Sequence, residues 1–244
     1  MAIIYQPRGR ALEYGPLAVN LYDGCTHGCL YCYAPSCRQK RREVYHAKAT
    51  PRKNIIELIK KEAPQYRGQE CFLCFTCDPW PAFTEVQLAG MAIDTLTEAG
   101  VRARTLTKSG ERSMVDLSRL VENGGVYGAT MTFIDESLSH YWEPGGDSPV
   151  GRMKALSYAK KLNLETWVSL EPVIDPDESL RIIGETHEFV DTYKIGTLNY
   201  NKSVAKGIDW IKFASQAVDL LEKLGKQYYL KKDLQKFLSS SVAA

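Results

Sequence analysis

Three cysteines near the amino terminus have the spacing of a metal-binding loop. Cys25, Cys29 and Cys32 are separated by three and by two residues, in the stretch CTHGCLYC. Three thiolates this close in sequence can each bind a different iron of one cubane cluster. Iron–sulfur clusters are usually held by four cysteines, so three would leave one iron open to a ligand from outside the protein. Gly24 and Gly28 let the backbone bend tightly around such a cluster.

A zinc ion is the main alternative at this loop, with His27 as a fourth ligand. His27 lies between two of the cysteines, which is awkward for a tetrahedral site. Structural zinc ligands also usually come as two separated pairs. The sequence therefore favours the iron–sulfur cluster, and a non-catalytic iron–sulfur or zinc module stays as an alternative.

The composition is that of an ordinary globular chain. It has 244 residues, 44% of them hydrophobic, and 31 basic and 29 acidic residues give a net charge of +2. That balance neither requires nor excludes a polyanionic partner. The amino terminus lacks the apolar stretch of a signal peptide, and no run approaches the roughly 18 apolar residues of a membrane span. We expect a soluble, cytoplasmic, monomeric protein that does not bind membranes. All seven cysteines lie in the first third, where metal ligation or catalysis explains their clustering better than disulfides.

Apolar segments of strand length alternate with helical patterns along the chain. Strands are predicted at 17–22, 70–76, 101–107, 126–133, 165–173 and 192–198, and helices at 51–62, 84–100, 111–124, 147–162, 175–189 and 206–225. This order predicts an α/β fold in which an open parallel sheet with outer helices forms a partial (β/α)6 TIM-type barrel. Functional residues should then lie at the carboxyl ends of the strands. We expect a single domain over 1–244, with its core at about 17–225 and the segment 226–244 packing on the barrel or partly disordered.

The cysteine motif resembles that of a known enzyme superfamily. C-x3-C-x2-C with Tyr31 before the last cysteine is the signature of the radical S-adenosylmethionine (SAM) superfamily. The stretch NLYDGCTHGCLYCYAP is similar to the spore photoproduct lyase-like branch. Further segments resemble that branch in the expected order, and they are DPWPAFTE (78–85), TLTKSG (105–110), EPGGDSPVGRMKAL (143–156) and SLEPVIDP (169–176).

The resemblance implies a radical enzyme with two cofactors. A [4Fe–4S] cluster on Cys25, Cys29 and Cys32 would bind SAM through its free iron. One electron, supplied by a flavodoxin- or ferredoxin-type donor, would cleave the C5′–S bond of SAM. The resulting 5′-deoxyadenosyl radical would abstract a hydrogen atom from the substrate. The protein would position the reactants and exclude water.

Residues at the predicted strand ends are candidates for binding SAM. Thr76 and Asp78 could bind the methionyl ammonium, although Asp-Pro also starts turns. Lys108 could bind the methionyl carboxylate or a substrate phosphate, and Thr132, with Thr130 on the same face, could contact the ribose. The remaining candidates are Tyr31 near the adenine, Arg152 as a carboxylate clamp, and Ser169 and Glu171 on one face of the fifth strand.

A second cysteine cluster, Cys71, Cys74 and Cys77, has three possible roles. Cys77 or Cys74 could donate a hydrogen atom to a product radical, the three could hold a second cluster, or they could be buried hydrophobes. Strand alternation places Cys71 and Cys77 on one face and Cys74 on the other, which speaks against a second cluster. The related lyases keep a cysteine where this chain has Phe75, so the resemblance implies the radical chemistry without fixing the substrate.

The substrate class is left open between two possibilities. The basic run RQKRR (38–42) follows the cysteine loop and could hold the phosphates of DNA or RNA, for repair or modification of a base. Aromatic residues that could stack on bases are Trp80, Tyr141, Trp142, Tyr193 and Tyr200. The alternative is radical modification of a peptide or small metabolite, which a compact barrel permits equally.

Overall fold

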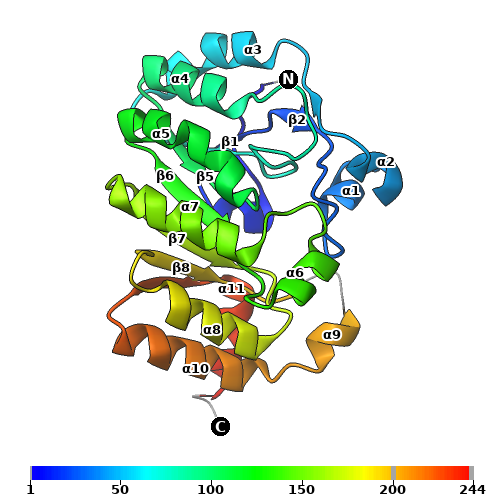
Figure 1. Ribbon diagram of the computed structural model, residues 1–244, viewed down its shortest axis with the longest axis vertical. Coiled ribbons are helices and arrows are strands. Elements are labelled where there is room, and N and C mark those ends of the chain that lie inside the picture. Colours follow the sequence, from blue (N-terminus) through cyan, green and yellow to red (C-terminus); the bar gives the residue numbers. More distant parts are fainter. Residues whose placement is uncertain (1, 199–201, 242–244) are drawn as a thin grey trace.

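A curved sheet of seven parallel strands forms the centre of the protein (Figure 1). The computed structural model describes residues 2–198 and 202–241. The strands follow one another in the sheet in chain order, so each neighbours the next one along the sequence. They are β1 (Leu17–Val19), β4 (Glu70–Leu73), β5 (Arg102–Thr105), β6 (Val126–Thr130), β7 (Glu165–Leu170), β8 (Thr192–Ile195) and β9 (Gln227–Leu230). Two short strands, β2 (Tyr22–Asp23) and β3 (Thr50–Pro51), form a separate antiparallel pair.

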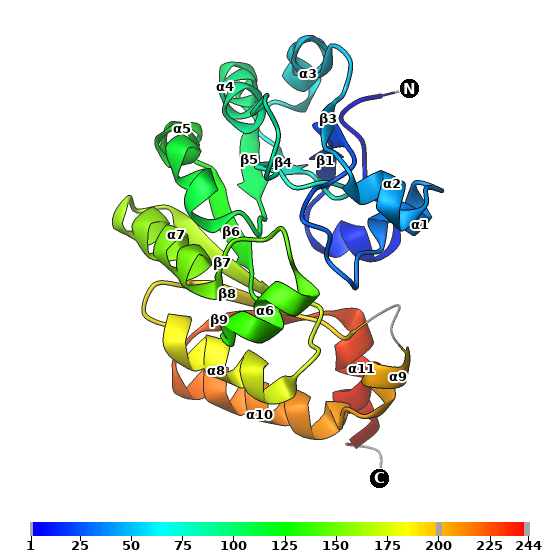
Figure 2. The same ribbon diagram turned by 45° about the vertical axis from the view of Figure 1, so that its right-hand side comes forward.

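Helices connect the strands and cover the outer face of the sheet (Figure 2). The longer ones are α3 (Ile55–Glu62), α4 (Ala89–Ala99), α5 (Leu117–Asn123), α7 (Pro149–Lys161), α8 (Pro176–Thr186), α10 (Trp210–Lys223) and α11 (Lys232–Ser241). Shorter elements are α1 (Ala34–Cys37), α2 (Arg42–His46), α6 (Glu136–Trp142), α9 (Lys202–Lys206), η1 (Gly9–Glu13), η2 (Ala63–Tyr66) and η3 (Gly110–Asp116). The predicted open α/β barrel is confirmed.

Local signals in the sequence explain several helix boundaries. Ser148 and Asp175 cap the first turns of α7 and α8, each followed by a proline, which suits the first helical position. Gly100 and Gly124 end α4 and α5 with φ angles of 71° and 64°, in the left-handed region that favours glycine.

The sheet has one strand more than the six that the sequence predicts. β9 pairs in parallel with β8, with Tyr228 opposite Tyr193. It lies in the segment 226–244, after the helix predicted at 206–225 as the last helix of the core. Only four residues long, β9 shows little periodicity of its own, and pairing with β8 is what makes it a strand.

Two apolar cores hold the fold together. The larger lies between the sheet and the helices, where residues such as Ile59, Leu96 and Ile183 are fully buried. The smaller fills the inside of the curved sheet and is built around Phe72 and Trp167. Phe72 of this inner core also lines a cavity at the carboxyl ends of the strands.

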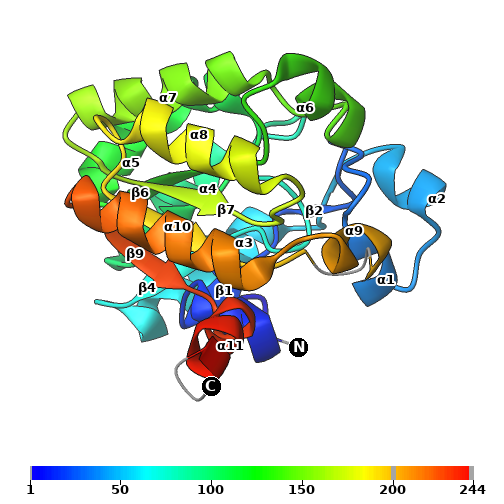
Figure 3. The same ribbon diagram turned by 90° about the horizontal axis from the view of Figure 1, so that it is seen from below.

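The amino-terminal segment crosses the gap between the two edge strands of the open barrel. Tyr5 pairs with Ala18 of β1 through two backbone hydrogen bonds of 2.8 and 2.9 Å. At the other edge, the Glu13 carboxylate accepts hydrogen bonds from the Tyr229 hydroxyl and the Lys232 amide. The segment therefore lies beside α11 (Figure 3), and it brings η1 to the open side of the sheet. Among residues 2–198 and 202–241, no helix has both the length and the apolar character needed to cross a membrane.

Candidate active site

A cavity of about 480 Å³ opens at the carboxyl ends of the strands. Consecutive strands from β4 onward contribute lining residues at or just beyond their ends, and these include Cys74, Leu106, Thr130, Glu171 and Lys231. The volume is in the range of small-molecule sites. The cavity thus lies at the end of the barrel where catalytic sites of such folds are found.

The loop with the three candidate cluster cysteines is held by α2. The Arg42 guanidinium donates hydrogen bonds to the carbonyl oxygens of Cys29, at 2.6 Å, and Cys32, at 3.2 Å. The His46 Nδ1 lies 2.8 Å from the carbonyl oxygen of Cys25. One short helix therefore contacts the backbone of all three cysteines and leaves their sulfur atoms available.

The thiols themselves suit an iron–sulfur cluster better than a single zinc ion. All three are free. Burial raises the pKa of Cys25 and Cys32, and the backbone N–H groups of His27 and Ala34 act against this rise. In the described part of the chain, no three Cys, His, Asp or Glu side chains are placed to hold one metal ion. Three free thiols in one short loop, each able to bind a different iron, are a donor set that fits a cubane cluster.

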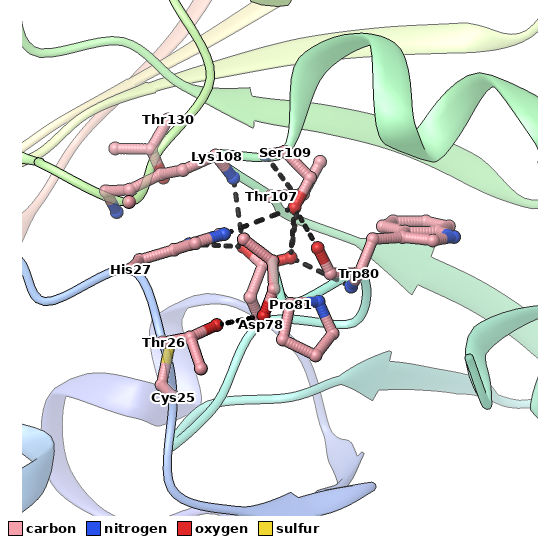
Figure 4. Close-up of polar contacts among 12 residues, drawn as sticks. Cys25, Thr26, His27, Asp78, Trp80, Pro81, Thr107, Lys108, Ser109 and Thr130 are labelled. Carbon is pink, nitrogen blue, oxygen red and sulfur yellow. Dashed lines mark hydrogen bonds and ion pairs between the residues drawn. The ribbon is translucent and has the colours of Figure 1, made fainter. Parts of the chain in front are cut away.

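Asp78 is the centre of a buried polar network beneath this loop (Figure 4). Its carboxylate accepts hydrogen bonds from the hydroxyls of Thr107 and Ser109, at 2.7 and 2.9 Å, and from the amides of Trp80 and Lys108, both at 2.9 Å. The network fixes the end of β5 against the loop after β4.

His27 joins the cysteine loop to this network. Its Nδ1 lies 3.4 Å from an Asp78 oxygen, and Arg112 lies 3.3 Å from its Nε2. Burial lowers the pKa of His27, which favours the neutral ring. Because both ring nitrogens are engaged here, His27 does not serve as a zinc ligand.

A second buried network surrounds Glu143. Its carboxylate forms an ion pair with Arg152 and accepts hydrogen bonds from the hydroxyls of Tyr31 and Thr132. Arg152 also donates to the Thr130 carbonyl oxygen at 3.0 Å and is almost fully buried. The network ties the end of β6 to the cysteine loop through Tyr31.

A third network lies across the cavity, around Glu171. The carboxylate accepts hydrogen bonds from the Tyr14 hydroxyl at 2.5 Å and from Lys231 at 2.6 Å. Tyr14 also lies 3.3 Å from the Ser169 hydroxyl. β7 ends at Leu170, so Glu171 follows the strand instead of lying within it as predicted. A carboxylate here needs a partner, and Lys231 is that partner.

The structure divides the predicted SAM-binding residues into two groups. Tyr31, Asp78, Lys108, Ser169 and Glu171 line the cavity. The other three are directed elsewhere. Thr76 binds Asn20 and Tyr45 through its backbone, and Thr132 and Arg152 bind Glu143. These three residues do not line the cavity. Among the described residues, the Nη2 of Arg152 is buried without a hydrogen-bond partner, so the roles predicted for the three stay predictions. Asp78 lines the cavity, but four hydrogen bonds and His27 occupy its carboxylate.

The second cysteine cluster separates into a pair and a single residue. Cys74 and Cys77 both line the cavity, whereas Cys71 is fully buried within β4 and does not. The alternation that placed Cys71 with Cys77 fails because β4 ends at Leu73 and Cys74 has a φ of 71°. The geometry therefore offers no convergence of three thiols for a second cluster.

The basic run 38–42 is only partly available to a ligand. Arg38 pairs with Asp23, and Arg42 holds the cysteine loop. The side chains of Lys40 and Arg41 are exposed. Among the aromatic candidates, Trp80 and Tyr193 are buried and unsuited to stacking, whereas Tyr141 is 64% exposed; Trp142 is partly exposed, and Tyr200 lies outside the described residues.

Several cavity residues escaped the sequence analysis, and they are Tyr14, Tyr33, Leu106 and Lys231. Lys231 directly follows β9, so the short run QYYL could have flagged it as a strand-end residue. Arg8, Arg10 and Tyr14 belong to the segment that crosses the barrel opening. No local pattern places that segment, because its position depends on contacts with both edges of the sheet.

Comparisons with known proteins show which solved structures have a similar fold. No family model and no curated protein matches the sequence. Among solved structures, spore photoproduct lyase complexed with dinucleoside spore photoproduct has a TM-score of 0.71 at 15% identity, over 93% of this chain and 79% of that one. A doubly substituted variant of that lyase, with bound AdoMet and dinucleoside spore photoproduct, has a TM-score of 0.69 at 14% identity, over 89% and 76%. SuiB of Streptococcus suis bound to precursor peptide SuiA has a TM-score of 0.66 at 11% identity, over 91% of this chain and 50% of that one.

These identities are low, so the likeness concerns the fold. The chain spans about half of SuiB and about four-fifths of spore photoproduct lyase. The resemblance drawn from the cysteine motif is confirmed at this level: the protein has the fold of spore photoproduct lyase and SuiB.

Proposed function

We propose that the protein is a radical SAM enzyme. The observation that carries the proposal is the three-cysteine loop, held by α2 at the edge of a cavity at the carboxyl ends of the strands. A [4Fe–4S] cluster on Cys25, Cys29 and Cys32, with SAM as its second cofactor, would supply one-electron cleavage of SAM and a 5′-deoxyadenosyl radical. The shared fold supports this reading, since one of the similar structures contains bound AdoMet.

Residues of the chain would hold SAM along the cavity. The Lys108 ammonium lies over the Tyr31 ring, 5.6 Å from its centre, on the side of the cavity next to the cysteine loop. It is the lining cation best placed for the methionyl carboxylate, whereas Arg152 does not line the cavity. Ser169 and Glu171 lie across the cavity, where they can accept hydrogen bonds from ribose hydroxyls.

A thiol on the cavity wall can complete the reaction. Cys74 or Cys77 would donate a hydrogen atom to the substrate-derived radical once the bond change in the substrate is complete. Burial raises the pKa of Cys74 well above that of a free thiol, so its S–H group persists at neutral pH. An electron donor of the flavodoxin or ferredoxin type would reduce the cluster.

The cavity lining favours a substrate that contains a nucleotide. The lining cations are Arg8, Arg10, Lys108 and Lys231, and the lining carboxylates are Asp78 and Glu171. Arg10 and Lys231 form ion pairs with Glu171, so Arg8 and Lys108 are the cations that make the lining positive. Aromatic rings, among them Tyr33 and Phe75, offer faces on which a base can stack. One similar fold is that of a lyase complexed with a dinucleoside. The competing reading, a peptide substrate, is supported by the fold of SuiB, which is bound to a precursor peptide.

Oligonucleotide binding separates these two substrate classes. Fluorescence anisotropy with short DNA and RNA should show binding that weakens with salt, because phosphate contacts release counterions. Arg8→Gln and the double change Lys40→Gln with Arg41→Gln should each weaken binding and reduce the salt dependence. Arg42 is unsuitable as a probe because it holds the cysteine loop. Absence of salt-dependent binding by either nucleic acid would favour the peptide.

A further inference from the structure

Cys74 and Cys77 lie side by side on the wall of the cavity. Burial, and then the neighbouring Cys77 thiol, raise the pKa of Cys74, and both residues line the cavity. Cys74 is buried, whereas Cys77 is partly exposed. Cys71, only three residues before Cys74, lies within β4 with no exposed surface. The chain thus separates two neighbouring thiols from a third that is close in sequence.

The backbone at Cys74 makes this pairing possible. Its φ angle of 71° lies in the left-handed region, which is disfavoured for any residue with a Cβ atom. In a continued strand, residues 74 and 77 would face opposite sides. The turn instead brings both residues to the wall of the cavity, and the Cys74 amide is anchored by a hydrogen bond of 2.8 Å to the Val19 carbonyl oxygen. An unfavourable conformation is therefore retained where it brings two cysteines together.

Two adjacent thiols in a C-x2-C sequence can exchange with a small disulfide such as oxidised glutathione. The more accessible thiolate, that of Cys77, attacks one sulfur of the small disulfide and releases one glutathione thiolate. Cys74 then gives its proton to the released glutathione thiolate, attacks the Cys77 sulfur and releases the second glutathione thiolate. One disulfide forms in the protein, one small disulfide is reduced to two thiols, and the two protons of the protein thiols pass to the products.

We propose that Cys74 and Cys77 are a redox-active dithiol that closes to a disulfide in the cavity wall. In the reduced state, the wall presents S–H groups to the bound substrate. In the closed state, neither sulfur carries a hydrogen. The formation of the disulfide does not depend on the proposed function, but its consequence, a redox control of the hydrogen supply, rests on it.

Peptide mass spectrometry of the full-length protein tests the pair directly. The protein, reconstituted with iron and sulfide under anaerobic conditions, is equilibrated in buffers of reduced and oxidised glutathione, quenched with an alkylating reagent and digested with trypsin. The peptide 68–102 contains all three cysteines of this region. In the oxidised protein, we expect this peptide to be two hydrogens lighter and to carry a single alkyl group, on Cys71. The oxidised fraction of the peptide should follow the ratio of oxidised glutathione to the square of reduced glutathione.

Matched variants identify the partners. Cys71→Ser should retain the disulfide, whereas Cys74→Ser and Cys77→Ser should each lose it and accumulate a glutathione adduct on the remaining thiol. The proposal is overturned if the wild-type peptide stays fully reduced in a large excess of oxidised glutathione, or if Cys71 provides one of the sulfurs. Release of 5′-deoxyadenosine from SAM, measured on the same preparation, keeps the two hypotheses apart. Disulfide formation without release contradicts the proposed function alone, and release without the disulfide contradicts the dithiol alone.

Discussion

The guanidinium of Arg42 donates a hydrogen bond of 2.6 Å to the backbone carbonyl oxygen of Cys29. The same guanidinium donates to the Cys32 carbonyl oxygen. Arg42 lies only ten residues beyond Cys32, so the chain returns through α1 and α2 to brace the loop that it has just formed. Arg42 therefore has a structural role within the basic run, whereas the side chains of its neighbours Lys40 and Arg41 are exposed.

Removing this brace should weaken cluster binding. In Arg42→Gln, the loss of charged donors to two ligand-bearing residues should lower the affinity for the cluster by about tenfold, the scale seen when groups that orient metal ligands are removed. The measurement is iron and sulfide content after reconstitution at limiting iron. Arg41→Gln, the same change at an exposed neighbour, should leave the content unchanged. Equal content in both variants would show that α2 does not position the loop.

Replacing Asp78 should destabilise the fold. Asp78→Asn substitutes an amide for a buried carboxylate that four donors and His27 share, and we expect a loss of about 3 kcal/mol. For a chain of this length, that loss corresponds to a melting temperature lower by roughly 6–12 °C. Glu85→Gln removes an exposed carboxylate nearby and is the control for charge. Calorimetry that finds the two variants equally stable would contradict the role of Asp78 as the centre of this network.

Glu171 and Lys231 should be energetically coupled. Lys231 is 2% exposed, so Glu171→Gln leaves a buried ammonium without its carboxylate partner, at a cost of about 3 kcal/mol. Lys231→Met should also destabilise, but the double variant should lose less than the two single losses combined. Urea unfolding of the four proteins measures this coupling. Strict additivity would show that the contact contributes nothing.

Lys194 should make stability depend on pH. Burial, and then the Arg104 cation, lower the pKa of Lys194 from 10.5 to about 8 in the folded protein. Between about pH 8 and 10.5 the unfolded chain keeps a proton that the folded chain has lost, so this residue adds stability as the pH rises. Lys194→Met should therefore be the more stable protein at pH 7, with an advantage that shrinks by about 1–2 kcal/mol towards pH 10 after allowance for solvent screening.

Both proteins keep the other charges that act on Lys194, which are those of Arg104, Glu70, Lys231 and Glu13. Their titration is therefore shared, and the difference in unfolding free energy reports on Lys194. The aromatic rings of Tyr14 and Trp167, 5.2 and 5.3 Å from its ammonium, favour the charged form. A difference that stays constant from pH 7 to pH 10 would mean that these rings hold the pKa near its ordinary value.

The sequence was sufficient where structure is local or strongly patterned. The six longer strand–helix units follow from alternating apolar segments, and Ser148, Gly100 and Gly124 mark helix ends through their own backbone preferences. The position of the cysteine loop follows from its place after β1 in a parallel fold. These features depend on few distant contacts.

The partners of buried charges could not be predicted in the same way. Arg152 was expected to bind a cofactor carboxylate, and it binds Glu143, nine residues before it in the sequence. Glu171 binds Lys231, which directly follows β9 and lies 60 residues later in the sequence. Such pairs are set by how the sheet curves and by which segment covers its open side, and neither property has a local sequence pattern.

The central claim is tested most directly by assaying the reconstituted protein for SAM cleavage. With iron, sulfide and dithionite under strict anaerobiosis, the wild-type protein should show cluster absorption in the visible range and should release 5′-deoxyadenosine from SAM. Cys29→Ala should abolish both signals, and Cys71→Ala should retain both. A wild-type protein that binds the cluster but releases no 5′-deoxyadenosine would contradict the assignment as a radical SAM enzyme.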